Sequence, residues 1–105
     1  MARLRVLEGP ADRALIPLDR NHFVIGRGTD CDLILPALYV SRKHAWIVGE
    51  GDEYFIEELS ARPRTFVNDE AIRGRVMLAH GDRIHIPSLT AIFLDGDDSH
   101  DGVQS

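Results

Sequence analysis

The sequence predicts an all-β domain, either an antiparallel sandwich or a barrel, from three observations. Short extended segments recur along the chain, and turn-forming Gly, Pro, Asn and Asp residues separate them. No window of a dozen residues keeps a 3.6-residue apolar period between these breakers, so no amphipathic helix is expected. Many short strands at close spacing are typical of sandwiches and barrels, and 105 residues suffice for one such domain.

The first half of the chain predicts four strands. Residues 3–6 alternate polar and apolar side chains, as a strand with one buried face does, and the Gly-Pro pair at 9–10 ends this segment. Apolar segments at 14–16 and 22–25 follow, separated by Asp-Arg-Asn. Residues 33–35 form a brief segment that ends at a proline.

The second half predicts seven more strands. Residues 45–48 and 54–56 flank Gly49-Glu50-Gly51-Asp52, which predicts a hairpin turn. Residues 65–67 lead into Asn68-Asp69, which predicts a tight turn before 71–72. The remaining segments are 76–78, 83–86 and 89–94. We expect the folded domain to span residues 1–95 and residues 96–105 to form a flexible acidic tail or linker, because they lack a core-forming pattern.

The composition excludes several classes of protein. The net charge of -5 argues against nucleic-acid binding, which needs an excess of Lys and Arg. No apolar run reaches the ~20 residues of a membrane-spanning helix, and the N-terminus lacks the apolar core of a secretory signal. The single cysteine, Cys31, permits no internal disulfide and fits a reducing compartment. We therefore expect a cytoplasmic protein with neither nucleic-acid nor membrane partners.

The basic residues are concentrated in turns. Three short turn-like stretches hold Arg27, Arg42, Lys43, Arg62 and Arg64, whereas no Lys or Arg follows Arg83. Cations collected in the loops of an acidic protein indicate an anion-binding site. The alternative is that these are scattered, solvated charges.

At these loops the sequence resembles the forkhead-associated (FHA) domain family. The resemblance rests on Phe-Val-Ile-Gly-Arg at 23–27, Cys-Asp-Leu-Ile-Leu at 31–35, Val-Ser-Arg-Lys-His-Ala at 40–45 and Thr-Phe-Val-Asn-Asp-Glu-Ala-Ile at 65–72. Leu78, the Gly-Asp-Arg-Ile run at 81–84 and Ile86 extend it, so that it covers about residues 3–94. It implies an FHA/SMAD-like sandwich of two twisted antiparallel sheets, with ligand loops at one end and an eleven-stranded pattern.

The resemblance also implies a phosphothreonine-binding adaptor for kinase-dependent signalling. Arg27 and Ser41 stand where the family binds the phosphate, and Arg42 stands beside them. His44 is implied to hold the loops together, and Gly26 to let the backbone turn tightly beneath the site. The chemistry agrees, because the planar fork of an arginine can donate two parallel hydrogen bonds to a phosphate. The expected partner is a protein phosphorylated by a Ser/Thr kinase, or a phosphorylated segment of the full-length chain itself.

The third loop departs from the family's Ser-Thr-Asn-Gly-Thr. Pro63 stands where the asparagine is expected, and it has neither a side-chain amide nor a backbone N–H to contact a peptide. That loss costs roughly 0.5–1.5 kcal/mol. Arg62 replaces a threonine and Arg64 a glycine, which predicts added positive charge at the site or a blocked groove. We expect phosphate binding to be retained with weakened or altered peptide selectivity.

Three other functions are considered. The first is a phosphate-independent interaction domain with a degenerate peptide site, which the loss of the asparagine favours. The second is an enzyme, but Ser41 and His44 lie three residues apart without a third partner, and Glu57 and Glu58 point to opposite faces of a strand. The third is a spacing or oligomerisation domain. We expect no catalysis, no cofactor and no metal, since the histidines show no metal-ligand spacing with Cys31.

Overall fold

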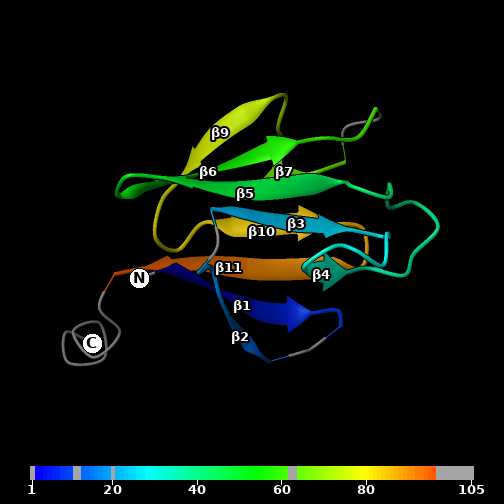
Figure 1. The fold of residues 1–105 in the computed structure, drawn as a ribbon, viewed down its shortest axis with the longest axis horizontal. Coiled ribbons are helices and arrows are strands. Elements are labelled where there is room, and N and C mark those ends of the chain that lie inside the picture. The colour runs from blue at the N-terminus through cyan, green and yellow to red at the C-terminus, as the bar shows by residue number, and fades with distance from the viewer. Residues whose placement is uncertain (1, 11–12, 20, 62–63, 97–105) are drawn as a thin grey trace.

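The computed structural model describes residues 2–10, 13–19, 21–61 and 64–96, and within these ranges the regular structure is entirely β (Figure 1). Eleven strands in the described residues form two sheets. They are β1 (Ala2–Glu8), β2 (Leu15–Pro17), β3 (His22–Gly26), β4 (Leu33–Ile34), β5 (Ala45–Glu50), β6 (Glu53–Glu58), β7 (Phe66–Val67), β8 (Glu70–Ala71), β9 (Arg75–Leu78), β10 (Arg83–Ile86) and β11 (Leu89–Asp95). Apart from Gly96, the expected tail lies outside the described residues.

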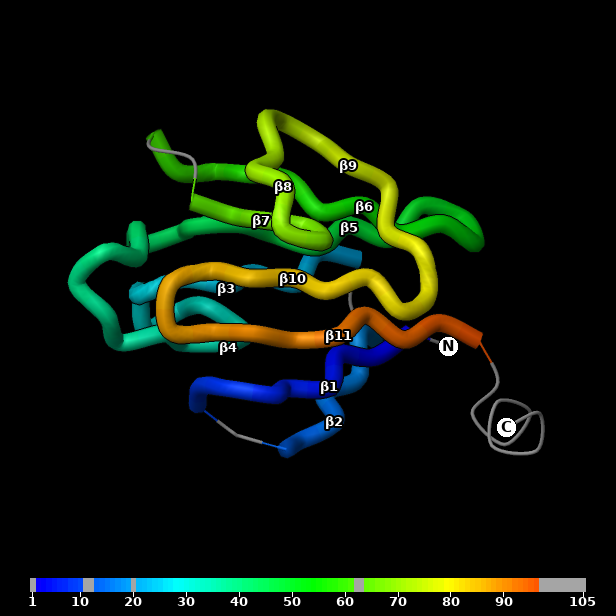
Figure 2. Tube along the Cα trace, turned by 180° about the vertical axis from the view of Figure 1, so that it is seen from behind, coloured from blue at the N-terminus to red at the C-terminus, as the bar shows by residue number. Residues whose placement is uncertain are grey.

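The two sheets pack face to face, which confirms the sandwich and excludes the barrel. The first sheet has the order β2-β1-β11-β10-β7-β8 and the second the order β4-β3-β5-β6-β9. Figure 1 shows the second sheet in front, and Figure 2 shows the first sheet from behind. Strand pairing is antiparallel except between β3 and β4, which run parallel. This parallel pair is the one exception, among the described strands, to the antiparallel pairing that the sequence predicts.

The core lies between the sheets and follows the alternation of the sequence. Leu4 and Val6 of β1 are buried whereas Arg5 between them is exposed, and Ile84 and Ile86 of β10 alternate with exposed residues in the same way. Phe93 is fully buried at the centre, and its ring lies 5.6 Å from that of Tyr54 on the opposite sheet. Burying side chains of this size stabilises a fold by about 1.5–3 kcal/mol each, so this alternation determines which faces meet.

Two hairpin turns show how the sequence sets the strand register. Asn68 and Asp69 both have positive φ, 52° and 71°, which is the two-residue turn that the Asn-Asp pair predicts between β7 and β8. Between β5 and β6, Glu50 pairs with Glu53, so the turn is only Gly51-Asp52. The four-residue turn expected at 49–52 is therefore too long. The positive φ of 63° at Gly51 closes the hairpin, and the two preceding residues stay in the strand.

Three loops meet at one end of the sandwich, at the right in Figure 1. They are the β3–β4 loop (27–32), the β4–β5 loop (35–44) and the described part of the β6–β7 loop (59–61 and 64–65). The cationic stretches of the sequence lie in these loops. Across the described residues, the structure has no helix with the length and apolar character needed to cross a membrane.

Candidate functional site

The end of β3 lies directly against the backbone of the β4–β5 loop. Arg27 N–H donates to the Ser41 carbonyl and Gly28 N–H to the Arg42 carbonyl, each at 2.9 Å, and His44 N–H donates back to the Ile25 carbonyl at 2.9 Å. These bonds fix the positions from which the side chains of Arg27, Ser41 and Arg42 start. Each of them is a main-chain bond, so the geometry does not depend on those side chains.

Gly26 permits this close contact. A Cβ added to Gly26 would lie 2.3 Å from the Arg42 carbonyl oxygen and 3.0 Å from the His44 nitrogen, far inside normal contact distance. Gly26 does not have the positive φ that favours glycine in tight turns. The reason expected for a glycine here, a tight backbone turn, is therefore wrong. The position requires the absence of a side chain and not an unusual backbone angle.

Arg27 and Ser41 line the same hollow. The Nε of Arg27 donates to the Val40 carbonyl at 3.1 Å, which fixes the guanidinium beside the peptide that leads into Ser41. The hollow measures about 330 Å³ and is lined by Arg27, Leu38, Tyr39, Val40, Ser41, Ala61 and Arg64. We call it the serine hollow. An arginine and a serine from separate loops therefore border one hollow.

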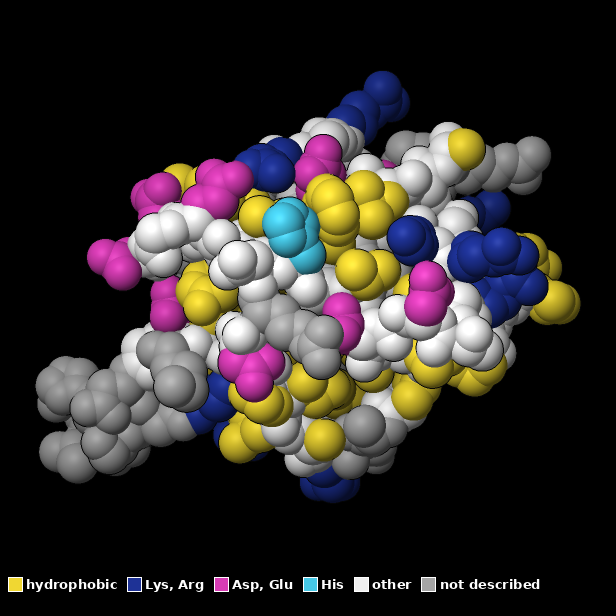
Figure 3. Space-filling model, viewed as in Figure 1, with side chains coloured by type: hydrophobic (Ala, Val, Ile, Leu, Met, Phe, Trp, Pro, Cys, Tyr) yellow, Lys and Arg dark blue, Asp and Glu magenta, His cyan; other side chains and the backbone are white. Residues whose placement is uncertain are grey.

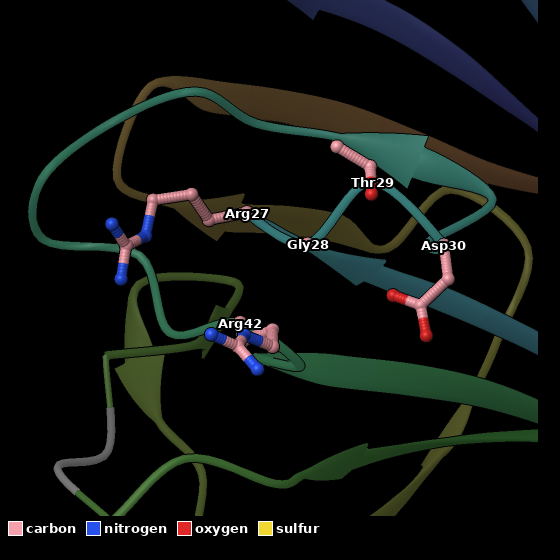
Figure 4. Close-up of a pocket in the computed structure, with 5 residues that line it drawn as sticks. All are labelled: Arg27, Gly28, Thr29, Asp30 and Arg42. Carbon is pink, nitrogen blue, oxygen red and sulfur yellow. The ribbon is translucent and has the colours of Figure 1, made fainter.

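Arg42 lies in an adjoining hollow of about 440 Å³, lined by Arg27, Gly28, Thr29, Asp30 and Arg42. Figure 4 shows Arg27 and Asp30 at opposite ends of this hollow, with Arg42 entering from the neighbouring loop. Arg27 borders both hollows, whereas Ser41 borders only the first and Arg42 only the second. Lys and Arg side chains gather at this end of the molecule, at the right of Figure 3.

Arg64 lies against an aromatic ring that also lines the serine hollow. Its guanidinium carbon is 5.4 Å from the centroid of Tyr39, in cation–π range. None of the described Asp and Glu residues forms an ion pair with Arg27, Arg42 or Arg64. The other two expected members of this loop, Arg62 and Pro63, lie outside the described residues.

His44 is completely buried beneath the loops. Its Nδ1 accepts a hydrogen bond from Ser41 N–H at 3.2 Å. Its carbonyl accepts from Leu59 N–H at 2.8 Å and from Ser60 N–H at 3.2 Å. These contacts connect the β4–β5 loop to the β6–β7 loop through one residue. Because Nδ1 accepts, the neutral imidazole carries its proton on Nε2.

Glu58 lies beside His44 and extends the connection. Its Oε2 is 3.5 Å from His44 Nε2 and accepts a hydrogen bond from the Ser60 hydroxyl, and its Oε1 accepts from Thr65 N–H at 3.1 Å. Burial lowers the pKa of His44, and the positive charge of Arg64 lowers it further, while Glu58 and the Arg64 backbone oppose this shift. The imidazole is therefore held in its neutral form at neutral pH.

Among the residues of this site that sequence reasoning missed are Glu58, Leu38 and Tyr39. A signal for Glu58 exists, because Tyr54, Ile56 and Glu58 alternate along β6, and a carboxylate on the inner face needs a partner. Leu38 and Tyr39 are 87% and 68% exposed. The sequence carries no signal for this, since apolar residues near a strand are usually expected in the core.

Cys31 supports the loops and is not placed for reactivity. Its Sγ is 3.1 Å from the Arg42 carbonyl, as a donor, and the residue is buried. Burial raises the pKa of the thiol, and Asp30 and Asp32 add to the effect. The thiol therefore helps to hold the backbone beneath Arg42. Among the described residues, no group of three or more His, Cys, Asp or Glu side chains is arranged to bind a metal ion.

Known proteins with similar sequences are bacterial regulators. The chain is 35% identical to the glycogen accumulation regulator GarA of Mycolicibacterium smegmatis over 95% of its own length and 63% of the relative. It is also 35% identical to the oxoglutarate dehydrogenase inhibitor of Corynebacterium jeikeium, over 90% of its length and 65% of that protein. The chain thus spans slightly less than two thirds of each of these relatives.

Solved structures agree with this relationship. Mycobacterium tuberculosis EmbR, in complex with a low-affinity phosphopeptide, aligns with a TM-score of 0.80 at 35% identity, over 91% of this chain and 25% of that one. The FhaA FHA domain, complexed with the intracellular domain of Rv3910, aligns with a TM-score of 0.76 at 27% identity, over 89% and 99% of the two chains. The profile of the FHA domain matches residues 23–87. The chain therefore belongs to the FHA domain family.

Proposed function

We propose that this chain is a non-catalytic adaptor that binds phosphothreonine in a partner protein. The observation that carries the proposal is the convergence of Arg27 and Ser41, from two loops, on the serine hollow. Two related solved structures support it, because one is a complex with a phosphopeptide and another concerns phosphothreonine-dependent FHA domain interactions. The partner would be a Ser/Thr kinase substrate or a phosphorylated segment of the full-length chain.

The chemistry of the site suits a phosphate. A phosphorylated threonine carries about -1.5 to -2 charges and three strong acceptor oxygens. The single bond from Arg27 Nε to the Val40 carbonyl leaves the two terminal amino groups of the fork to donate. The Ser41 hydroxyl adds a neutral donor, and Arg42 adds a cation from the adjoining hollow. Arg62 and Arg64 belong to the same proposed binding set.

The local geometry does not favour a hydrolase. A serine nucleophile needs a histidine nitrogen free to accept its hydroxyl proton. The Nδ1 of His44 instead accepts from the backbone N–H of Ser41, and its Nε2 faces the buried carboxylate of Glu58. The histidine is therefore committed to holding the loops.

Isothermal titration calorimetry tests the proposal, with a phosphothreonine peptide and its unphosphorylated twin as ligands. We expect only the phosphorylated peptide to bind the wild type. Arg27→Ala should weaken binding by about 10-fold to 100-fold, since a charge-assisted hydrogen bond contributes roughly 1.5–3 kcal/mol. Ser41→Ala should weaken it by about 3-fold to 10-fold, through a neutral hydrogen bond.

Arg5→Ala is the matched control. It removes one exposed arginine from β1, on the other sheet, and should leave phosphopeptide affinity within about twofold. Equal binding of the two peptides would refute the proposal. If a cellular partner is known, unchanged binding of that partner to Arg27→Ala and Ser41→Ala would favour the phosphate-independent alternative, which the proline at position 63 supports.

A further inference from the structure

We propose that Arg64, held against Tyr39, selects ligands that carry a second anionic group beside the phosphothreonine. The inference rests on the proposed phosphothreonine site and adds a specificity determinant to it. The second group is a carboxylate side chain or another phosphate, because a guanidinium recognises both by the same hydrogen-bond geometry.

Arg64 and Arg27 are held at different parts of the serine hollow. Ser41 and Arg64 are both partly buried, whereas Arg27 is exposed and Tyr39, over which Arg64 lies, is 68% exposed. Arg27 is fixed beside Ser41 by its bond to the Val40 carbonyl. A phosphate bound by Arg27 and Ser41 would therefore lie beside the peptide that joins Val40 to Ser41, and Arg64 would face the ligand residues that pass over Tyr39.

The contact with Tyr39 holds the Arg64 guanidinium beside the ring. Among the described residues, no hydrogen bond occupies the side-chain donors of Arg64. Five in-plane N–H groups therefore remain for a ligand. Because the ring restricts the side chain before the ligand arrives, less rotamer freedom is lost on binding than for an unrestrained surface arginine.

The local charge favours a second anion. The two hollows contain three arginines, Arg27, Arg42 and Arg64, against one acidic residue, Asp30, and none of these arginines has an ion-pair partner among the described acids. Asp30 and Arg42 both line the adjoining hollow, so the serine hollow itself holds two arginines and none of the described acidic residues, and Arg64 has no carboxylate beside it there. The family's usual glycine at this position would supply no such charge.

The experiment measures a ratio of affinities by calorimetry. A phosphothreonine peptide with neutral flanking residues is compared with versions in which Asp, and in parallel the uncharged isostere Asn, is placed at each flanking position in turn. A further peptide carries a second phosphothreonine at the position where Asp has the largest effect. These arms distinguish a carboxylate from a second phosphate as the preferred group.

We expect the wild type to prefer Asp over Asn by about 3-fold to 10-fold at one or two positions on one side of the phosphothreonine. Arg64→Gln should reduce this ratio to below about twofold, and Arg64→Glu should reverse the preference, so that Asn is favoured over Asp. Tyr39→Phe should retain the ratio because it keeps the ring, whereas Tyr39→Ala should lower it. Arg5→Gln, which removes the same charge from β1, should leave the ratio unchanged. High salt should shrink the preference.

An Asp/Asn ratio near one at every position, or an unchanged ratio in Arg64→Gln, would overturn the inference while phosphothreonine binding stands. If the neutral phosphothreonine peptide itself fails to bind the wild type, the proposed function fails, and this inference fails with it. Each readout is a ratio within one variant, so a general loss of affinity in a variant does not obscure the result.

Discussion

Gly26→Ala is the sharpest test of how the fold builds the site. The added Cβ would lie 2.3 Å from the Arg42 carbonyl oxygen, 2.9 Å from the Arg42 carbonyl carbon and 3.0 Å from the His44 nitrogen. All three atoms belong to backbone, so no side-chain rotation can relieve the contact. The β4–β5 loop must move away from β3 by roughly 1 Å to restore a normal separation.

We expect two consequences of that movement. The free energy of unfolding should fall by about 2–3 kcal/mol, as overpacking at a tightly packed position does, which corresponds to a drop in Tm of roughly 10–20 °C for a domain of this size. The bonds from Arg27 and Gly28 to the loop carbonyls should also lengthen, which separates Arg27 from Ser41. Phosphopeptide affinity should therefore fall by about tenfold or more.

Urea unfolding followed by circular dichroism measures the first effect, and calorimetry the second. Gly49→Ala is the control, because its Cβ would meet only the Tyr54 side chain, at 3.1 Å, and that ring can adjust. It should cost less than about 1 kcal/mol and leave ligand affinity unchanged. A Gly26→Ala variant within 0.5 kcal/mol of the wild type, on the order of ordinary surface changes, would refute the steric argument.

Two further predictions concern stability. The pKa of His44 is lowered in the folded state, so the stability that its neutral form supplies is complete above about pH 6.5 and declines as the pH falls below that value. The free energy of unfolding should fall less between pH 7 and pH 5 in His44→Gln than in the wild type. An equal fall in the two proteins would contradict this. Ser88 has a φ of 72° at the second central position of the β10–β11 turn, a backbone angle that favours glycine. Ser88→Gly should therefore raise the free energy of unfolding by about 0.5–1 kcal/mol, measured by thermal unfolding. Ser88→Ala should give no gain.

The strands could be predicted because their signal is local. Alternation at 3–6 and 83–86 and turn residues such as Asn68-Asp69 determine which face is buried and where the chain reverses. Each of the eleven expected segments overlaps one strand, although most strand edges differ by one or more residues. The Gly51-Asp52 turn was misjudged because a strand edge depends on cross-strand pairing, which no short window contains.

The site could be predicted only in part. The resemblance places Arg27, Ser41 and Arg42 in loops, and the structure brings these loops together through backbone bonds. It could not show that Ser41 and Arg42 line different hollows that share Arg27, since that depends on side-chain directions. The contact between Arg64 and Tyr39 joins residues 25 positions apart on loops that no periodic pattern describes. Long-range contacts between loops are the information that local sequence does not contain.

The main-chain bonds between β3 and the β4–β5 loop suggest how such a domain can change its ligand during evolution. The carbonyls of Ser41 and Arg42 and the amides of Arg27 and Gly28 hold the two loops in register, whatever side chains they bear. Side-chain substitutions in these loops can therefore accumulate without breaking the main-chain bonds, provided that residue 26 remains a glycine. A designer could use the same property by changing the loop side chains on this scaffold to obtain binders with altered ligand preferences.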